Sequence, residues 1–181
     1  MKTENTAFGC IFCVTGKEDQ LALEIMSHCP ETQAFCMKQK KRKTRQGVTV
    51  WTETVLFPGY VFFKASVDAN VSASITGEYI LSILTDEAGE WQLYGEDKNF
   101  ARWVFQNHGL IGVSSACREG NRIRMLAGPL KDYEAQIVSV DKRNQNGKVI
   151  LNFGGKSFHA WLGYELVETT ETQGVQVAQQ R

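Results

Sequence analysis

Leu56-Phe57-Pro58-Gly59-Tyr60-Val61-Phe62-Phe63 joins a Pro-Gly pair to a run of aromatic and β-branched residues. Such residues favour strands, but proline has no N–H to donate to a sheet, so the pattern predicts a strand with a bulge or kink at Pro58. Side chains alternate along a strand, so Tyr60 and Phe62 are expected on one face and Val61 and Phe63 on the other. Both faces are apolar, and both must be covered.

Two interpretations fit the second apolar face of this strand. In the first, the strand is central and helices cover it on both sides, so that the rings belong to the core. In the second, the aromatic residues form an exposed patch that docks a partner, because buried aromatic anchors dominate the energetics of interfaces. The pattern alone does not choose between them.

The composition limits the class of protein. The chain has 181 residues, enough for one large or two small domains, and 43% of them are hydrophobic. Its 20 Lys and Arg balance 20 Asp and Glu, so any contact with nucleic acid must come from local clustering of cations. No apolar run approaches the length of a membrane span, and we expect a soluble, cytoplasmic protein.

The five cysteines do not suggest a disulfide framework or a metal site. Cys10 and Cys13 have C-x-x-C spacing, but they lie in an apparent strand, where a separation of three places side chains on opposite faces. We therefore expect reduced thiols, no metal and no cofactor. The sequence also lacks a glycine-rich phosphate loop and any nucleophile beside a base, so it does not indicate an enzyme.

Alternating strand and helix signals run from the N-terminus to about residue 107. A capping box is expected at Thr15 and Glu18, at the start of the first helix. The order of signals predicts an α/β sandwich with a mostly antiparallel sheet. Strands are expected at 8–14, 33–37, 48–55 and 79–84, and helices from 18 to 29, at 66–76 and at 97–107.

Six cations without an intervening acidic residue, from Lys38 to Arg45, follow the second expected strand, and the last five are the candidates. Self-repulsion predicts a mobile hairpin loop here, and its charge would be drawn to phosphate backbones, with non-template DNA as the candidate partner. These candidate DNA-contacting residues are Lys40, Lys41, Arg42, Lys43 and Arg45.

Beyond residue 109 the pattern changes to short strands with regular turns. The small polar residues of 110–118 suggest a linker. Alternation in Arg122–Leu126 and a hairpin signal at Asn146-Gly147 then predict a five-stranded SH3-like barrel over 119–168. Residues 169–181 lack large apolar side chains other than valine and are expected to form a flexible tail.

The sequence resembles the NusG family of transcription elongation factors over nearly its whole length. Leu56-Phe57-Pro58-Gly59-Tyr60-Val61 looks like the signature of the family's N-terminal (NGN) domain, which would span 1–109. Glu119-Gly120-Asn121-Arg122-Ile123, Ala127-Gly128-Pro129 and Gln136-Ile137-Val138-Ser139-Val140-Asp141 look like its C-terminal KOW module. Ala135 stands where the KOW pattern usually has glycine. The sequence of Arg122–Tyr133 is most similar to the LoaP-type branch of specialised antiterminators.

This resemblance implies an α+β chain whose NGN-type domain binds the clamp helices of RNA polymerase. Phe57 and Tyr60 would face the polymerase, with Pro58 and Gly59 setting the bend that presents them. It also implies a mobile KOW barrel that recruits another molecule. For the LoaP-type branch that molecule would be an RNA hairpin in a nascent leader transcript.

Seven cations of the barrel are the candidate RNA-binding residues. The barrel's excess of positive charge is small, so binding by shape and a few aimed side chains is expected, as for RNA hairpins. Lys142, Arg143 and Lys148 could equally form a solvated hairpin tip, and Phe153 is a candidate contact for a protein partner. The seven residues are Arg122, Arg124, Lys131, Lys142, Arg143, Lys148 and Lys156.

Three functions remain open at this point. The favoured one is an operon-specific, monomeric antitermination factor that bridges RNA polymerase and an RNA hairpin. The alternative is a general NusG-type elongation factor whose KOW domain binds termination factor or the ribosome. A third, a ribosome-associated KOW protein, is disfavoured by the aromatic strand of the N-terminal part.

Overall fold

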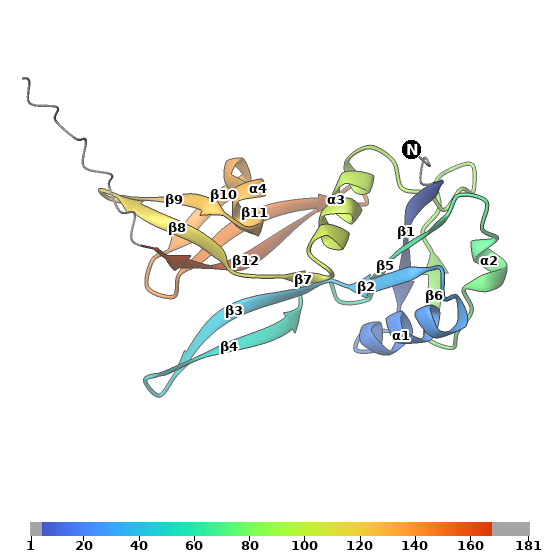
Figure 1. Cartoon of the computed structure of the whole chain (residues 1–181), viewed down its shortest axis with the longest axis horizontal. Helices are drawn as coiled ribbons and strands as arrows, with labels where there is room; N and C mark the ends of the chain where they lie inside the picture. Colours follow the sequence, from blue (N-terminus) through green and yellow to red (C-terminus); the bar gives the residue numbers. More distant parts are fainter. Residues whose placement is uncertain (1–4, 168–181) are drawn as a thin grey trace, which may run out of the picture.

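The computed structural model describes residues 5–167, with the backbone alone described at Thr44, Arg45 and Ser72. The expected tail, 169–181, lies outside the described residues. The chain is a mixed α+β protein, and its N-terminal half is residues 5–111 (Figure 1). In that half the elements are β1 (Thr6–Cys13), α1 (Glu18–His28), β2 (Gln33–Cys36), β3 (Lys38–Arg45), β4 (Val48–Val55), β5 (Tyr60–Ser66), α2 (Val71–Ser74), β6 (Ile80–Ile83), α3 (Gly95–Gln106) and β7 (Leu110–Ile111).

A four-stranded sheet in the order β2-β5-β1-β6 forms the centre of the N-terminal half. β5 pairs antiparallel with both β1 and β2, and the alternation expected for it is confirmed. Val61 and Phe63 belong to a core cluster that includes Leu21 and Ile25 of α1, whereas Phe62 belongs to a second cluster. The sheet therefore carries apolar side chains on both faces.

The Pro-Gly pair forms a tight turn between β4 and β5, where a bulge or kink within one strand was expected. β4 ends at Val55 and β5 begins at Tyr60, whose N–H donates to the carbonyl of Phe57 at 3.3 Å. Gly59 has φ +84°, and a Pro-Gly pair with positive φ at the glycine is typical of a type II turn. Pro58 suits the first central position of this turn, and Gly59 suits the second.

The basic run is a regular strand, and the expectation of a loop was wrong. β3 pairs with β4 along all eight residues, from Lys38 opposite Val55 to Arg45 opposite Val48. The chain reverses at Gln46 and Gly47, which both have positive φ, as a tight hairpin turn requires. Alternation spreads the cations over both faces of the hairpin, which lessens the repulsion that had suggested a loop.

The helix expected at 66–76 is shorter than predicted. Only Val71–Ser74 is helical, and it begins where the Asn70 side chain accepts a hydrogen bond from the Ala73 N–H. The helix expected at 97–107 is confirmed as α3, which starts two residues earlier and buries Phe100, Trp103 and Val104.

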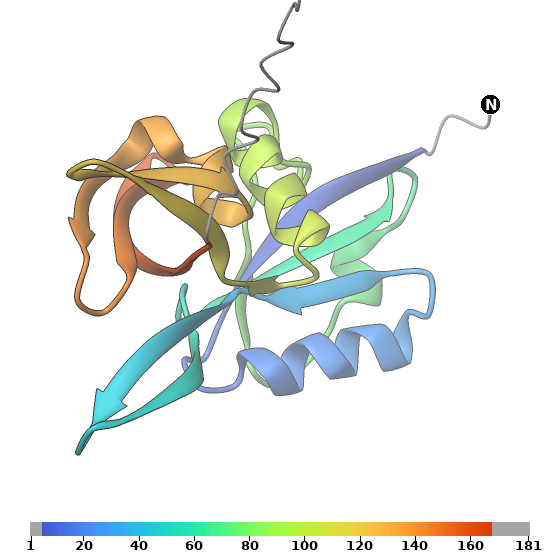
Figure 2. The same cartoon turned by 60° about the vertical axis from the view of Figure 1, so that its left-hand side comes forward.

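The C-terminal part forms a five-stranded sheet in the order β10-β11-β12-β8-β9. Figure 2 shows that this sheet curls round on itself, and we call residues 114–166 the barrel. Its elements are β8 (Ser114–Glu119), β9 (Arg122–Ala127), α4 (Pro129–Asp132), a 3-10 turn η1 (Glu134–Gln136), β10 (Ile137–Asp141), β11 (Asn146–Phe153) and β12 (Lys156–Leu166).

Two local predictions for this region differ from the structure. Most of the expected linker, 110–118, lies in β7 and β8, because β8 pairs with both β9 and β12. Asn146 and Gly147 lie in β11 opposite Asp141 and Val140, and the turn occupies 142–145 instead. The Asp141 carboxylate stabilises this turn by accepting hydrogen bonds from the N–H groups of Arg143 and Asn144, both at 3.0 Å.

Candidate functional site

The turn at Phe57–Tyr60 is held by a buried carboxylate. Glu18, at the start of α1, is 3% exposed, and its two oxygens accept hydrogen bonds from the N–H groups of Gly59 (2.7 Å) and Gly16 (2.9 Å). The Gly59 carbonyl in turn accepts from the Cys13 N–H at 2.8 Å. The expected capping box is therefore wrong, since Glu18 clamps the turn to the end of β1 and Lys17 occupies the N-cap.

The aromatic side chains of the turn are covered by the barrel. Phe57 is 2% exposed, and its ring centroid lies 4.5 Å from that of Phe158 in β12. Phe153 lies 6.1 Å from Tyr60, 5.0 Å from Phe62 and 5.3 Å from Phe100. One continuous apolar cluster thus joins the two parts of the chain, and the candidate polymerase-facing ring of Phe57 is inside it.

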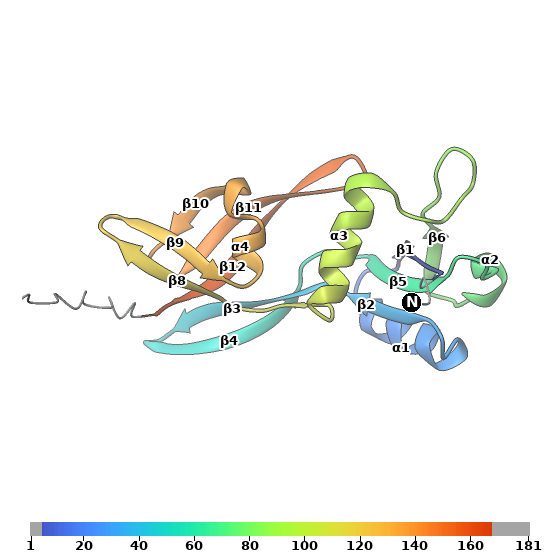
Figure 3. The same ribbon diagram turned by 45° about the horizontal axis from the view of Figure 1, so that its top comes forward.

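Polar contacts accompany these rings along α3. Figure 3 shows the β11–β12 hairpin reaching the N-terminal end of α3. There the Gly154 N–H donates to Asp97 Oδ1 at 2.9 Å. Farther along α3, Trp103 Nε1 donates to Asp132 Oδ2 at 3.2 Å and its ring lies 4.7 Å from Tyr133. Burial, with a smaller effect of Asp132, raises the pKa of Tyr133 to about 12.

Part of the aromatic surface stays open beside the barrel. A cleft of about 320 Å³ lies between the sheet and the β11–β12 turn, and Phe12 on its wall is 38% exposed. The Phe12 and Tyr60 rings lie 5.4 Å apart. The lining residues of the cleft are Phe12, Tyr60, Ser82, Leu84, Phe153, Gly154 and Lys156.

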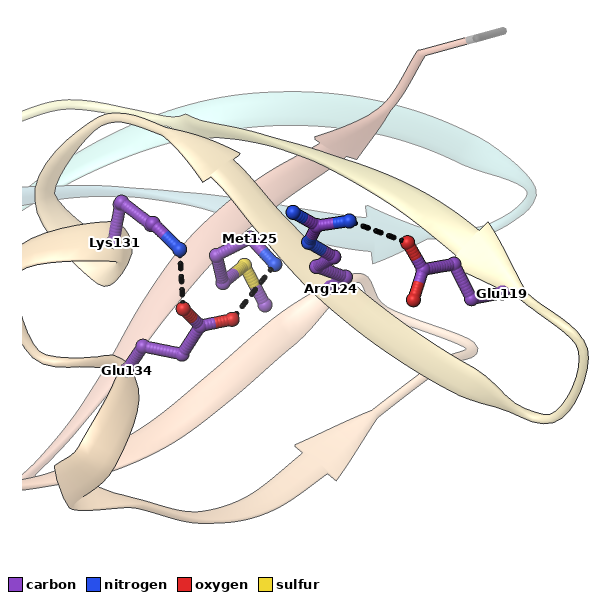
Figure 4. A network of polar contacts seen from close by, with 5 residues as sticks. All are labelled: Glu119, Arg124, Met125, Lys131 and Glu134. Carbon is purple, nitrogen blue, oxygen red and sulfur yellow. Dashed lines mark hydrogen bonds and ion pairs between the residues drawn. The ribbon is translucent and has the colours of Figure 1, made fainter. Parts of the chain in front are cut away.

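Four of the seven candidate RNA-binding residues gather around β9. Arg122 and Arg124 are exposed on that strand, Lys131 is exposed on α4, and Lys142 Nζ donates to the carbonyl of Asn121 beside Arg122. Arg124 pairs with Glu119 at 2.8 Å and Lys131 with Glu134 at 2.5 Å (Figure 4).

These ion pairs are solvent-exposed, with side-chain exposures of 39% to 59%. Lys131 lowers the pKa of Glu134 by hydrogen bonding, and Glu119 raises that of Arg124 in the same way. Exposed ion pairs are weak because water screens the two charges, so a phosphate group can compete with either carboxylate. The group around β9 can therefore bind an anion in spite of its acidic neighbours.

The other three candidates lie elsewhere on the barrel. Lys156 follows the two glycines of the β11–β12 turn and lines the cleft beside Tyr60. Lys148 lies in β11 opposite Trp161 of β12, and Arg143 is in the β10–β11 turn. The seven cations therefore do not form one site.

The candidate DNA-contacting hairpin lies against the barrel, because β3 contacts β12. Arg42 Nη1 donates to Gln145 Oε1, in the turn that also holds Arg143. Lys43 is exposed, and Lys40 and Lys41 are half-buried. For Arg45 the structure describes the backbone alone. At the base of the hairpin Lys38 pairs with Asp19 at 2.7 Å, and this hydrogen bond lowers the pKa of Asp19.

The thiols are placed as the sequence predicted. Cys10 and Cys13 belong to different core clusters on opposite faces of β1, so they cannot share a metal ion. Burial raises the pKa of Cys13 to about 11, with a smaller effect of Glu18. Among residues 5–167, no group of His, Cys, Asp and Glu is arranged to hold a metal ion. Within the same range, no helix is long and apolar enough to cross a membrane.

Sequence reasoning missed three residues that the structure places at these surfaces. Glu18 was assigned to a helix cap. No local pattern indicated that its carboxylate would accept a hydrogen bond from Gly59, 41 positions away. Trp51 and Trp161 were not singled out, yet they are 36% and 37% exposed where the hairpin meets the barrel. The sequence feature that could have identified them is a large tryptophan on an otherwise polar face of a strand.

No family model matches the chain, and no curated protein matches it. Among solved structures, one described as "Domain interaction in Thermotoga maritima NusG" is similar to it at 14% sequence identity. The similarity covers 87% of this chain and 93% of that chain, with a TM-score of 0.49. A likeness at this level does not establish shared function.

Proposed function

We propose that the chain is a transcription elongation factor that binds RNA polymerase through the surface around the Phe57–Tyr60 turn. The observation that carries the proposal is a preformed aromatic surface, clamped from behind by Glu18 and covered by a separate barrel. Large aromatic anchors on a rigid backbone are what a protein interface requires. The sequence motifs shared with the NusG family supply the identity of the partner, the clamp helices.

Binding of polymerase at this surface requires the barrel to leave it. Phe153 and Phe158 occupy the positions that a partner helix would need beside Tyr60 and Phe57. A partner that binds only the uncovered surface shifts the population toward the released barrel by its differential affinity for the two states. The factor would then hold the polymerase closed on its template and resist pausing.

The released barrel would bind an RNA hairpin through the cations around β9. Arg122, Arg124, Lys131 and Lys142 lie close enough together to contact one backbone, and this supports processive antitermination at specific operons. The alternative is a general elongation factor whose barrel binds termination factor or the ribosome. Phe153 favours it, since release would expose this ring to a protein partner.

Affinity measurements with purified core RNA polymerase test the proposal. Phe153→Ala should bind polymerase more tightly than the wild type, because less contact opposes release of the barrel. Tyr60→Ala added to Phe153→Ala should then remove most of the gain, whereas Arg102→Glu, at an exposed position of α3, should not. If neither the wild type nor any variant bound polymerase, the proposal would be contradicted.

Gel shifts with RNA distinguish the two barrel partners. A pool of RNA stem-loops with randomised loops is selected on the Phe153→Ala protein, and the survivors are titrated against charge-reversal variants. Arg122→Glu and Lys131→Glu are expected to abolish binding, with Arg102→Glu as the matched control. Failure to select any stem-loop, together with capture of ribosomal protein or termination factor by the same variant, would favour the general factor.

A further inference from the structure

A second surface lies where the basic hairpin crosses the barrel. Beneath the crossing is Gly163 of β12, where a Cβ atom would lie 3.2 Å from the Lys40 carbonyl oxygen and 3.3 Å from Trp51 Cζ3. A residue without a side chain is what permits this close approach of β3 to β12. The Trp51 ring rests against the barrel at this point and remains 36% exposed.

A second indole lies two residues away on the same strand. Residues i and i+2 of a strand share a face and are separated by about 6.6 Å, so Trp161 and Gly163 point outward together. Trp161 is 37% exposed, and Lys148, its partner on β11, places Nζ 6.0 Å from the ring centroid. The hairpin and the barrel thus contribute one half-exposed tryptophan each to a common surface.

Cations lie at both ends of this pair of rings. Lys148 is at the Trp161 end. At the other end Arg42, opposite Trp51 in the hairpin, donates to Gln145, a neutral partner that leaves its charge intact. Arg143 is exposed in the same turn as Gln145. The carboxylates nearest in register are Glu53, opposite Lys40, and Glu165, two residues beyond Gly163. Asp141 also lies beside Arg143, whose N–H donates to Asp141 Oδ1 at 3.0 Å.

Packing alone accounts for only part of this arrangement. The other two tryptophans, Trp91 and Trp103, are 9% and 5% exposed, as expected for large rings in a core. Trp51 covers a glycine, but Trp161 presents its ring to solvent under a lysine. Exposed aromatic rings spaced along a groove and flanked by cations are the features that stack unpaired bases and hold their phosphates.

We propose that Trp51 and Trp161 form a stacking platform for single-stranded nucleic acid, with Arg42, Lys148 and Arg143 contacting its phosphates. Unpaired bases are required, because the faces of paired bases in a duplex are already stacked. This platform is separate from the group around β9, and under the proposed function it would be lost when polymerase binding releases the barrel. Its two rings come from different parts of the chain, so it exists only while the barrel is docked on the hairpin.

Fluorescence anisotropy of labelled oligonucleotides tests the platform with the full-length protein. The probes are a twelve-nucleotide oligo(dT), a twelve-nucleotide oligo(rU) and a DNA duplex of the same length, at low salt. We expect both single strands to bind and the duplex to bind at least about tenfold more weakly. Preference between the two single strands would show whether RNA or DNA is the ligand. Equal binding of duplex and single strands would overturn the proposal.

Substitutions then locate the binding surface. Trp51→Ala and Trp161→Ala should each weaken single-strand binding about tenfold, and Trp161→Phe, which keeps a ring, by less. Gly163→Val should also weaken it, because the added side chain pushes the hairpin from the barrel while both indoles remain. Arg102→Glu, at an exposed position of α3, is the control and should leave affinity unchanged.

Intrinsic fluorescence of the wild type gives a measurement that does not depend on the folding of any variant. Trp91 and Trp103 are buried, so stacking on the two exposed indoles should quench the exposed part of the emission as oligo(dT) is added. Binding seen by anisotropy without any quenching would place the oligonucleotide elsewhere and overturn the proposal.

Discussion

The two faces of β5 are equally buried, but different parts of the chain cover them. Phe63, on one face, is covered within the N-terminal half and lies 5.2 Å from Trp91. Phe62, on the other, is also 0% exposed, but Phe153 of the barrel lies over it at 5.0 Å. The covering residue is 28 positions away in the first case and 91 in the second.

Burial alone therefore does not distinguish a core from an interface. The face of Phe63 cannot be uncovered without separating β5 from α1, which unfolds the N-terminal half. Under the proposed function the barrel leaves the face of Phe62 as a unit, since its strands pair with one another, while Phe100 of α3 stays 5.6 Å from the Phe62 ring. One strand can thus support a stable core and a switchable interface, and the following substitutions separate the two roles.

Phe63→Ala should have the largest effect on stability. Removal of a fully buried phenylalanine costs about 3–5 kcal/mol in free energy of unfolding, because of lost transfer energy and the cavity that remains. Urea denaturation measures the change, and Leu23→Ala, at a position 66% exposed on α1, is the control expected near zero. Similar values for the two variants would mean that this face of β5 is not a core.

Phe153→Ala should separate the two parts of the chain and leave each folded. The substitution removes ring contacts with Tyr60, Phe62 and Phe100, each worth about 0.5–1.5 kcal/mol beyond the buried area. Small-angle X-ray scattering should show a larger radius of gyration with an unchanged circular dichroism spectrum. An unchanged radius would indicate that the polar contacts of α3 suffice to hold the barrel.

Glu18→Gln should loosen the turn that positions Tyr60. The amide keeps one oxygen acceptor but presents an NH₂ group to one of two backbone N–H donors, which leaves that donor unpaired at a cost of about 1–3 kcal/mol. Urea midpoints give the loss, with the exposed Glu31→Gln as control. A stability equal to that of the control would contradict the clamp.

Alkaline pH should weaken the packing around Tyr133. Its pKa is raised from 10.0 to about 12 in the folded protein, so its stabilising contribution is present below pH 10 and is lost as the pH rises toward 12. Thermal melts from pH 9 to pH 12 measure this loss. Tyr133→Phe should show a shallower decline over the same window, and identical profiles would remove Tyr133 as a cause.

The sequence predicted local features of the fold well where a short pattern specifies them. The alternation of β5 and the buried face of α3 follow from side chains two or four positions apart, and both are confirmed. The separation of Cys10 and Cys13 follows from the same alternation. Charge repulsion was a poor guide to the basic run, because strand pairing spreads Lys40 to Arg45 over two faces.

The candidate site was harder to predict because its contacts are long-range. The motif Phe57–Tyr60 located the turn, but no local pattern indicated that Phe158 would cover Phe57 or that Glu18 would hold Gly59. The roles of these residues in binding polymerase, and of the barrel cations in binding RNA, remain predictions.

The sequence by itself thus determined the alternating apolar faces, the aromatic motif at Phe57–Tyr60 and the basic run, since propensity and alternation act between near neighbours. Packing between segments dozens of residues apart specified which apolar face the barrel covers and where the hairpin meets Gly163. These contacts depend on how complete surfaces fit together, and that fit is a property of the folded chain.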